Sequence, residues 1–111
     1  MLVTKKWGTE RWLVNEPDGY CVKEMTVLPG WRCSLHFHNV KDETFYVVQG
    51  TVMLAVDNVM HRLEVGDHYR IKPGQIHRFH ATGGVPATFI ECSTFHDDAD
   101  VVRLVESEPI A

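Results

Sequence analysis

One stretch decides the fold: Gly30-Trp-Arg-Cys-Ser-Leu-His36-Phe-His38-Asn-Val-Lys-Asp-Glu43-Thr-Phe-Tyr-Val-Val-Gln-Gly50. Two of its histidines, His36 and His38, are two residues apart, and residues at that spacing point to the same face of a β-strand. The chain then passes through the polar residues 39–42 and returns as a run of β-forming residues that begins at Glu43. We therefore predict a hairpin that lays the Glu43 carboxylate beside the two imidazoles.

A third imidazole is available further along the chain, in the segment Pro73-Gly-Gln-Ile-His77. Three imidazoles and one carboxylate form a ligand set for a divalent transition metal, and Zn, Mn, Fe, Ni and Co fit it about equally well. No cysteine stands at a ligand position, and calcium prefers oxygen ligands. Burying these four side chains against one another would be costly without a metal. We therefore predict one divalent metal ion per chain, with the ligands His36, His38, Glu43 and His77.

About ten short strands are expected, with turn residues at the spacing of an all-β sandwich or barrel. No segment shows a sustained helical period. The pair Asp57-Asn58 predicts a tight hairpin turn, because both residues tolerate positive φ, and residues 106–111 are expected to fray. After an apolar patch at residues 12–14, the expected strands are Tyr20–Leu28, Arg32–His38, Glu43–Gln49, Thr51–Val56, Val59–Val65, Tyr69–Lys72, His77–Thr82, Ala87–Phe95 and Val101–Val105.

Length and composition exclude several classes of protein. The 111 residues fit one domain with one modest core. A net charge of −4 argues against nucleic acid as a partner, since phosphate binding needs a basic face. No apolar run approaches the ~20 residues of a membrane span, and no apolar segment of signal-peptide type follows Met1. Because Cys21, Cys33 and Cys92 include no Cys-x-x-Cys pair, we expect reduced thiols in a cytoplasmic protein.

The spacing Gly30-x5-His36-x-His38-x4-Glu43-x6-Gly50 resembles the first motif of the cupin superfamily. A later run echoes the second cupin motif at Gly66-Asp67, Pro73-Gly74 and His77. The resemblance implies that residues 1–111 are a single cupin domain, folded as a double-stranded β-helix, or jelly-roll, barrel. It also implies one metal inside the barrel, held by the same three histidines and Glu43.

A closer likeness covers nearly the whole chain. The chain resembles the cupin domain of type II mannose-6-phosphate isomerases, and small stand-alone sugar isomerases. The matching residues are Lys6-Trp7-Gly8, Tyr20-x-Val22-Lys23, His77-Arg78, Glu91 and Asp98-x-Asp100-Val-Val-Arg103-Leu104. This resemblance implies an aldose–ketose isomerase that acts on a small sugar or sugar phosphate. Such a reaction moves a proton between neighbouring carbons through an enediolate, and a metal with open positions stabilises the developing negative charge.

Further site roles follow from the resemblance and from charge. Candidates for the proton-transferring base are Glu43, if it leaves the metal, and His80. Candidate anchors for substrate hydroxyls or a phosphate are Lys23, Arg78 and Arg103. Two alternatives stay open. His80 stands three residues after the last metal histidine, so on a continuing strand it faces the other way. Lys23 points either outward along an apolar strand or into the barrel.

The remaining polar residues are assigned to the surface. His61, His68 and His96 have no partners at useful spacing, and the cluster Asp97-Asp-Ala-Asp100 is expected to form a solvated turn. We also expect a homodimer, because residues 7–14 carry aromatic side chains and the edge strands of a short barrel need covering.

Two other functions fit the same ligand set. With Fe(II) bound, the site leaves positions for a substrate and O₂, as in a cupin dioxygenase. A non-catalytic sugar-binding barrel is the third alternative. A small molecule is the expected ligand in each case, and the isomerase-like segments near both ends of the chain favour the isomerase.

Overall fold

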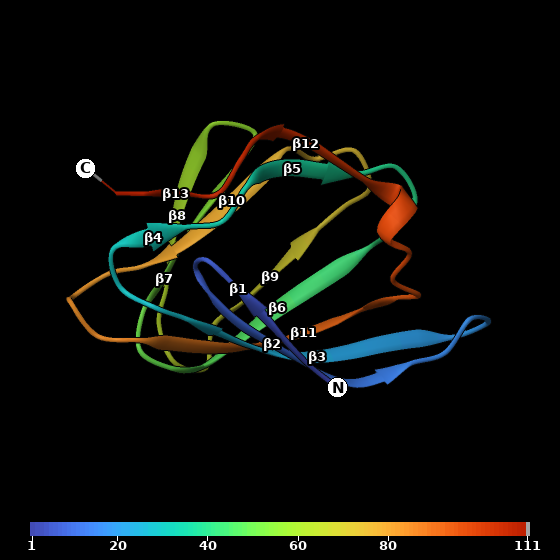
Figure 1. Cartoon of the computed structure of the whole chain (residues 1–111), viewed down its shortest axis with the longest axis horizontal. Helices are drawn as coiled ribbons and strands as arrows, with labels where there is room; N and C mark the ends of the chain where they lie inside the picture. The colour runs from blue at the N-terminus through green and yellow to red at the C-terminus, as the bar shows by residue number, and fades with distance from the viewer. Residues whose placement is uncertain (111) are drawn as a thin grey trace.

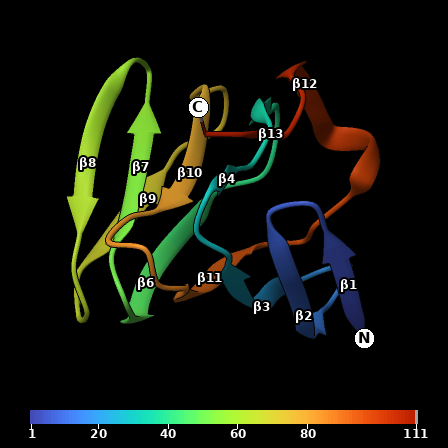
Figure 2. The ribbon, with the colours of Figure 1, turned by 60° about the vertical axis from the view of Figure 1, so that its left-hand side comes forward.

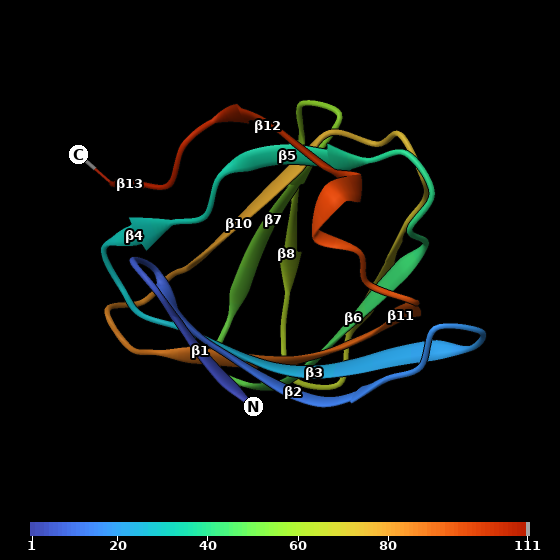
Figure 3. The same cartoon turned by 45° about the vertical axis from the view of Figure 1, so that its right-hand side comes forward.

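The computed structural model describes residues 1–110, which form two antiparallel sheets packed face to face (Figure 1). The first sheet has the strand order β1 (Leu2–Lys5), β2 (Gly8–Asn15), β3 (Tyr20–Val27), β11 (Ala87–Thr94), β6 (Glu43–Gln49) and β9 (His68–Ile71). The second has the order β12 (Val101–Val105), β5 (Leu35–His38), β10 (His77–Ala81), β4 (Trp31–Arg32) and β13 (Glu108–Pro109), and β10 also pairs with the hairpin of β7 (Val52–Val56) and β8 (Val59–Leu63). The predicted all-β double-sheet barrel is confirmed, and Figure 3 shows the two sheets enclosing its interior.

Residues 1–110 form thirteen strands rather than about ten. Short segments at both ends of the chain also pair, and the expected strand Arg32–His38 is divided into β4 and β5. At the amino terminus, β1 and β2 form a hairpin in which Leu2 faces Arg11 and Lys5 faces Gly8. In the tail that the sequence predicts to fray, Glu108 pairs with Arg32 of β4. The last residue of that tail, Ala111, lies outside the described residues. Residues 1–110 contain no helix with the length and apolar character that a membrane span requires.

Alternation along the central strands of the first sheet decides which side chains enter the barrel. In β3 every second residue from Cys21 to Val27 is buried, and in β11 the buried residues are Ala87, Phe89 and Glu91. This two-residue period is the one expected of a strand with one face towards a core. It also places the charged residues Lys23 and Glu91 at inward positions among apolar ones.

The turns follow the backbone preferences of their residues. Asp57 and Asn58 have φ values of 48° and 67° and join β7 to β8, with Val56 facing Val59 across the turn, as predicted. Gly50 closes the motif with φ of 72°, and a Cβ atom there would lie 2.6 Å from the Pro86 carbonyl oxygen. A side chain at position 50 would therefore force the 86–87 segment away.

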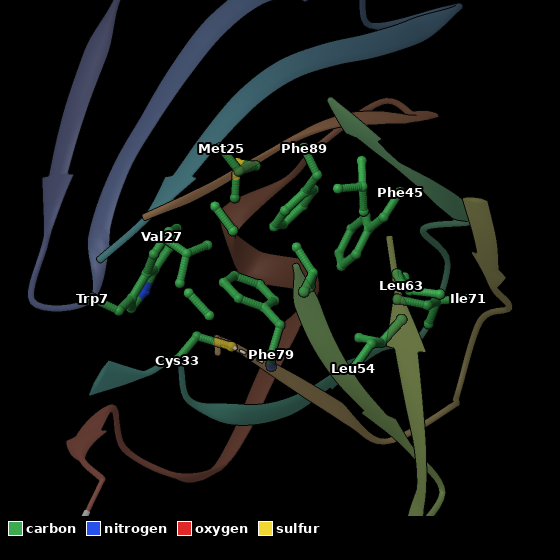
Figure 4. Packing of buried hydrophobic residues seen from close by; sticks show 14 of the residues in the cluster. Trp7, Met25, Val27, Cys33, Phe45, Leu54, Leu63, Ile71, Phe79 and Phe89 are labelled. Atoms are coloured by element: carbon green, nitrogen blue, oxygen red, sulfur yellow. Dashed lines mark hydrogen bonds between the residues drawn. The ribbon is translucent and has the colours of Figure 1, made fainter. Parts of the chain in front are cut away.

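The apolar core is built around aromatic rings from both sheets (Figure 4). Phe79 of β10 makes edge-on contacts with Trp7 and Phe89, with ring centroids 5.0 and 5.1 Å apart. Phe45 of β6 stacks on Phe89 at 4.3 Å and lies 6.5 Å from the ring of His77. The core therefore ends against the histidines and supports them from one side.

Candidate metal centre

Three histidines meet inside the barrel. The antiparallel pair β5 and β10 places His77 directly opposite His36, and the strand period puts His38 on the same face. The centroids of the His36 and His77 rings are 4.3 Å apart, and that of His38 lies 5.2 Å from His36 and 5.7 Å from His77. One nitrogen from each ring lies within 4.8 Å of the others, which is close enough for all three to ligate one ion.

Glu43 reaches the histidines from the opposite sheet. Its Oε1 atom lies 3.1 Å from His77 Nε2, its Oε2 atom lies 3.5 Å from His38 Nε2, and the side chain is 2% exposed. The predicted hairpin is wrong, because β5 pairs with β10 and β12 whereas β6 pairs with β11 and β9. Residues 39–42 instead carry the chain across the barrel from one sheet to the other. The carboxylate still arrives beside the imidazoles, since both strands face the same interior.

The donor atoms fit a divalent metal. His77 Nδ1 lies 2.9 Å from the Gln75 carbonyl and His36 Nδ1 lies 2.8 Å from the Ser34 carbonyl. Each ring donating its Nδ1 proton to that carbonyl leaves the Nε2 lone pair for a ligand. Among the described residues, the buried atoms that lack a hydrogen-bond partner include His38 Nδ1, Glu43 Oε2 and His77 Nε2. Buried polar atoms are normally satisfied, so this cluster of unsatisfied atoms fits a site for a cation.

The protonation states of these side chains also favour a metal site. Burial, with a contribution from His77, lowers the pKa of His36 to about 3, and burial lowers the pKa of His38 to about 4. Both rings are therefore neutral at physiological pH, the form that ligates metal. Burial alone would raise the pKa of Glu43, but the neighbouring His77 and Lys41 shift the pKa well below its usual range. The site thus offers neutral nitrogen donors and one ionised oxygen donor.

Lys41 is a functional candidate that the sequence reading missed. Its ammonium group is buried and lies 2.7 Å from Glu91 Oε2, 3.2 Å from Glu43 Oε2 and 2.9 Å from His96 Nδ1. Burial alone would lower the pKa of Lys41, but the two carboxylates raise that pKa above its ordinary value. The residue therefore joins the candidate metal ligand Glu43 to a second buried carboxylate, Glu91.

The loop that carries Lys41 is held by Asp100. The Asp100 carboxylate accepts hydrogen bonds from the backbone N–H groups of Asn39, Val40 and Lys41, at 3.0 to 3.2 Å. Asp100 ends a short 3₁₀ helix at Asp98–Asp100, in the segment predicted to be a solvated turn. That prediction is incomplete, because one of the acidic side chains anchors the loop between the sheets. Only the tertiary structure brings these segments together, since they are about 60 residues apart.

Lys23 points into the barrel, which resolves the alternative left open by the sequence. Its side chain is 2% exposed and faces Glu91, the residue opposite it on β11, with Nζ 4.0 Å from Glu91 Oε2. The same Nζ lies 3.5 Å from Glu10 and 4.1 Å above the Trp12 ring. Burial and the charge of Glu43 raise the pKa of Glu91, and the two lysines only partly offset that rise. The cavity wall therefore holds two buried carboxylates with opposite pKa shifts.

These groups surround an internal cavity of about 100 Å³. Its polar lining includes Lys23, His36, His38, Lys41, Glu43, Glu91 and His96, and its apolar side is formed by Trp7, Met25, Phe45 and Phe79. His77 contacts Glu43 but does not line the cavity. This combination of an apolar wall, convergent polar groups and perturbed pKa values is typical of small-molecule sites.

A family model described as "Cupin domain" matches residues 23–93. The chain belongs to the cupin family. The structure of KdgF from Halomonas sp. has a TM-score of 0.79 to this cupin at 19% identity, covering 89% of each chain. A conserved protein with a double-stranded β-helix domain from Klebsiella pneumoniae has a TM-score of 0.77 at 22% identity, covering 91% of this chain and 87% of that one. These neighbours establish the double-stranded β-helix fold.

Two relatives concern sugars. This cupin is 29% identical over 106 residues to a mannose-1-phosphate guanylyltransferase of Escherichia coli (strain K12), covering 94% of this chain and 22% of that protein. It therefore spans about a fifth of the length of that enzyme. It is 32% identical over 108 residues to a D-lyxose/D-mannose isomerase of Thermosediminibacter oceani, covering 73% of this chain and 59% of that protein.

The structure does not bring every predicted site residue to the cavity of this cupin. On β10, His77 and Phe79 point inward, so Arg78 and His80 lie on the other face. Arg78 donates to the Cys33 carbonyl from Nε and Nη2, at 3.1 and 2.9 Å, and neither Arg78 nor His80 lines the cavity. Arg103 does line it, at the mouth.

His96, which was assigned to the surface, also lines the cavity. Its two ring nitrogens lie 2.9 Å from Lys41 Nζ and 2.8 Å from an Asp98 carboxylate oxygen. No spacing rule connects His96 to the histidines of the first motif, so the sequence pattern could not predict that His96 lines the cavity.

Proposed function

We propose that this cupin is a metal-dependent aldose–ketose isomerase acting on a small sugar or sugar phosphate. The observation that carries the proposal is the cavity lined by His36, His38, Glu43 and a second buried carboxylate, Glu91. His77 completes the histidine cluster from beside Glu43. Isomerisation needs both parts, a charge-stabilising centre and a separate group that moves a proton. The D-lyxose/D-mannose isomerase relative supports sugar chemistry, at 32% identity.

In this proposal His36, His38, His77 and Glu43 hold the metal. When bound, the metal polarises the substrate carbonyl and stabilises the negative charge that develops on its oxygen. Glu43 stays ionised beside Lys41 and supplies the oxygen ligand. The apolar wall formed by Phe45 and Phe79 limits water around the reacting carbons.

We assign the proton transfer to Glu91. Its carboxylate removes the proton from C2 of the aldose and returns it to C1, while the hydroxyl proton on O2 passes to O1, which balances the conversion to the ketose. Lys41 and Lys23 fix the orientation of Glu91 from two sides. Burial and the charge of Glu43 raise the pKa of Glu91, which suits a group that must both accept and donate a proton. His80, on the opposite face of β10, has no part in this assignment.

The test is a panel of aldoses, ketoses and their phosphates, run with protein reconstituted with each of five metals, in D₂O and followed by NMR. Interconversion of one aldose–ketose pair with deuterium appearing at C1 or C2 is expected. Glu91→Gln should lower kcat by about 10²–10⁴-fold while keeping its metal, and the exposed Glu16→Gln should match the wild type.

Two outcomes overturn the proposal. One is the absence of any aldose–ketose interconversion by the metal-loaded protein across the panel. The other is turnover that consumes O₂ and stops under anaerobic conditions, which would assign the site to a dioxygenase.

A further inference from the structure

A second, open cavity of about 420 Å³ lies outside the metal cavity. It is lined by Thr4, Lys5 and Lys6 from the end of β1 and by Arg103, Glu106 and Ser107 from the end of the chain. Figure 2 shows the β1–β2 hairpin rising from the first sheet towards the β12–β13 segment of the second. Lys5, Arg103 and Ser107 line both cavities. The outer cavity is therefore continuous with the entrance to the metal site.

The outer cavity is positive in a chain whose net charge is −4. Lys5, Lys6 and Arg103 contribute three cations, and Glu106 contributes the one carboxylate of the lining. Among the described side chains, neither Lys6 nor Arg103 has a carboxylate within ion-pair distance, and Lys5 reaches Glu10 only at 4.0 Å. The cations of this cavity are thus available for an external anion, unlike the neutralised lysines inside the barrel.

Size also argues for a ligand that occupies both cavities. The inner cavity of about 100 Å³ falls short of the ~300–1,000 Å³ usual for small-molecule sites. Together with the outer cavity of about 420 Å³ the space enters that range. A substrate that is longer than the inner cavity, with its reacting carbons at the histidines, would extend its far end past Arg103 and Lys5.

We propose that the outer cavity binds the phosphate of the substrate, which makes the substrate a sugar phosphate rather than a free sugar. Arg103 offers a planar pair of donors to phosphate oxygens, Lys5 and Lys6 add charge, and the Ser107 hydroxyl adds a donor. This inference rests on the proposed isomerase function for the reacting end of the substrate, and it assigns the other end.

Binding of inorganic phosphate to metal-stripped protein, followed by ³¹P NMR, tests the subsite without turnover. Wild-type protein should bind phosphate, and Arg103→Gln should weaken that binding by about 10- to 100-fold, the loss expected for charge-assisted hydrogen bonds. The matched control is Arg11→Gln, which removes the same charge from an exposed position on β2 outside both cavities. Equal phosphate binding by Arg103→Gln and wild type, or no binding by the wild type, overturns the inference.

Kinetics with the metal-loaded enzyme separates this inference from the proposed function. For a phosphorylated substrate, Arg103→Gln and Lys6→Gln should raise KM with little change in kcat, and for the free sugar the rise in KM should be much smaller. Isomerisation of free sugars with no preference for the phosphates overturns the phosphate subsite and leaves the isomerase standing. Phosphate binding that depends on Arg103, in a protein that isomerises no sugar, overturns the isomerase and leaves the subsite standing.

Discussion

Replacing Lys41 by methionine tests how the interior of the barrel is held together. The substitution keeps a long side chain of similar shape but removes the ammonium group that lies 2.7 Å from Glu91 and 3.2 Å from Glu43. Both carboxylates are almost completely buried, so neither gains water in exchange. The variant keeps two buried carboxylates, with only the more distant Lys23 ammonium group left beside Glu91.

The expected loss is large. Breaking a buried ion pair by removing one partner costs about 3–5 kcal/mol, which for a domain of this size lowers Tm by roughly 10–25 °C. The loss should depend on pH. Without Lys41, the pKa of Glu91, which burial and Glu43 already raise, should rise further, and the pKa of Glu43 should rise towards its unfolded value. The charged Glu91 carboxylate then costs stability at neutral pH, and protonation relieves that cost as the pH falls towards about 5.

The assay is urea denaturation of metal-stripped protein at pH 7.5 and pH 5, with Lys72→Met as the control because Lys72 is exposed. Lys41→Met should unfold at much lower urea than the control at pH 7.5, and the difference should narrow at pH 5. Equal urea midpoints for the two variants would refute the stabilising role of the Lys41 ammonium group. So would a difference in urea midpoint between Lys41→Met and the control that is the same at both pH values.

Three further predictions concern the loop, the histidines and the assembly. Asp100→Ala removes the acceptor of the loop N–H groups and should cost about 1–3 kcal/mol of unfolding free energy. The exposed Asp18→Ala should cost little in the same denaturation assay, and equal losses would contradict the anchoring role. Because burial lowers the pKa of His36 to about 3 and of His38 to about 4, below the ~6.5 of an unfolded histidine, the unfolded chain binds more protons in that window. Metal-free protein should therefore lose stability as pH falls from about 6.5. A urea unfolding midpoint that stays constant down to pH 4.5 would contradict this. A homodimer is also expected, and a monomer mass at every concentration in light scattering would rule it out.

The sequence was most informative where local periodicity decides position. The two-residue spacing of His36 and His38 fixed their common face, and the turn before His77 returned a third imidazole to them. The same period, applied from His77 onward, places Arg78 on the opposite face. The substrate-anchoring role that the family resemblance suggested for Arg78 is inconsistent with this position.

The features that the sequence did not predict depend on pairing between residues far apart in the chain. Whether residues 39–42 form a hairpin or cross between sheets depends on the strands that flank them, and both routes bring Glu43 to the histidines. Lys41 looked like a turn residue because its partner Glu91 is 50 residues away. Buried charges of this kind are invisible to local patterns, since a lysine in a loop is exposed in most proteins.

The metal content of the purified protein is the most direct test of the proposed metal site. Protein prepared without chelator or affinity metal should be incubated with Zn, Mn, Fe(II), Ni or Co salts, desalted and measured by elemental analysis. We expect one divalent ion per wild-type chain, its loss in His36→Ala, His38→Ala and His77→Ala, and partial retention in Glu43→Gln, which keeps an oxygen donor but removes its charge. A folded wild-type protein that stays metal-free with all five salts would contradict the proposed site.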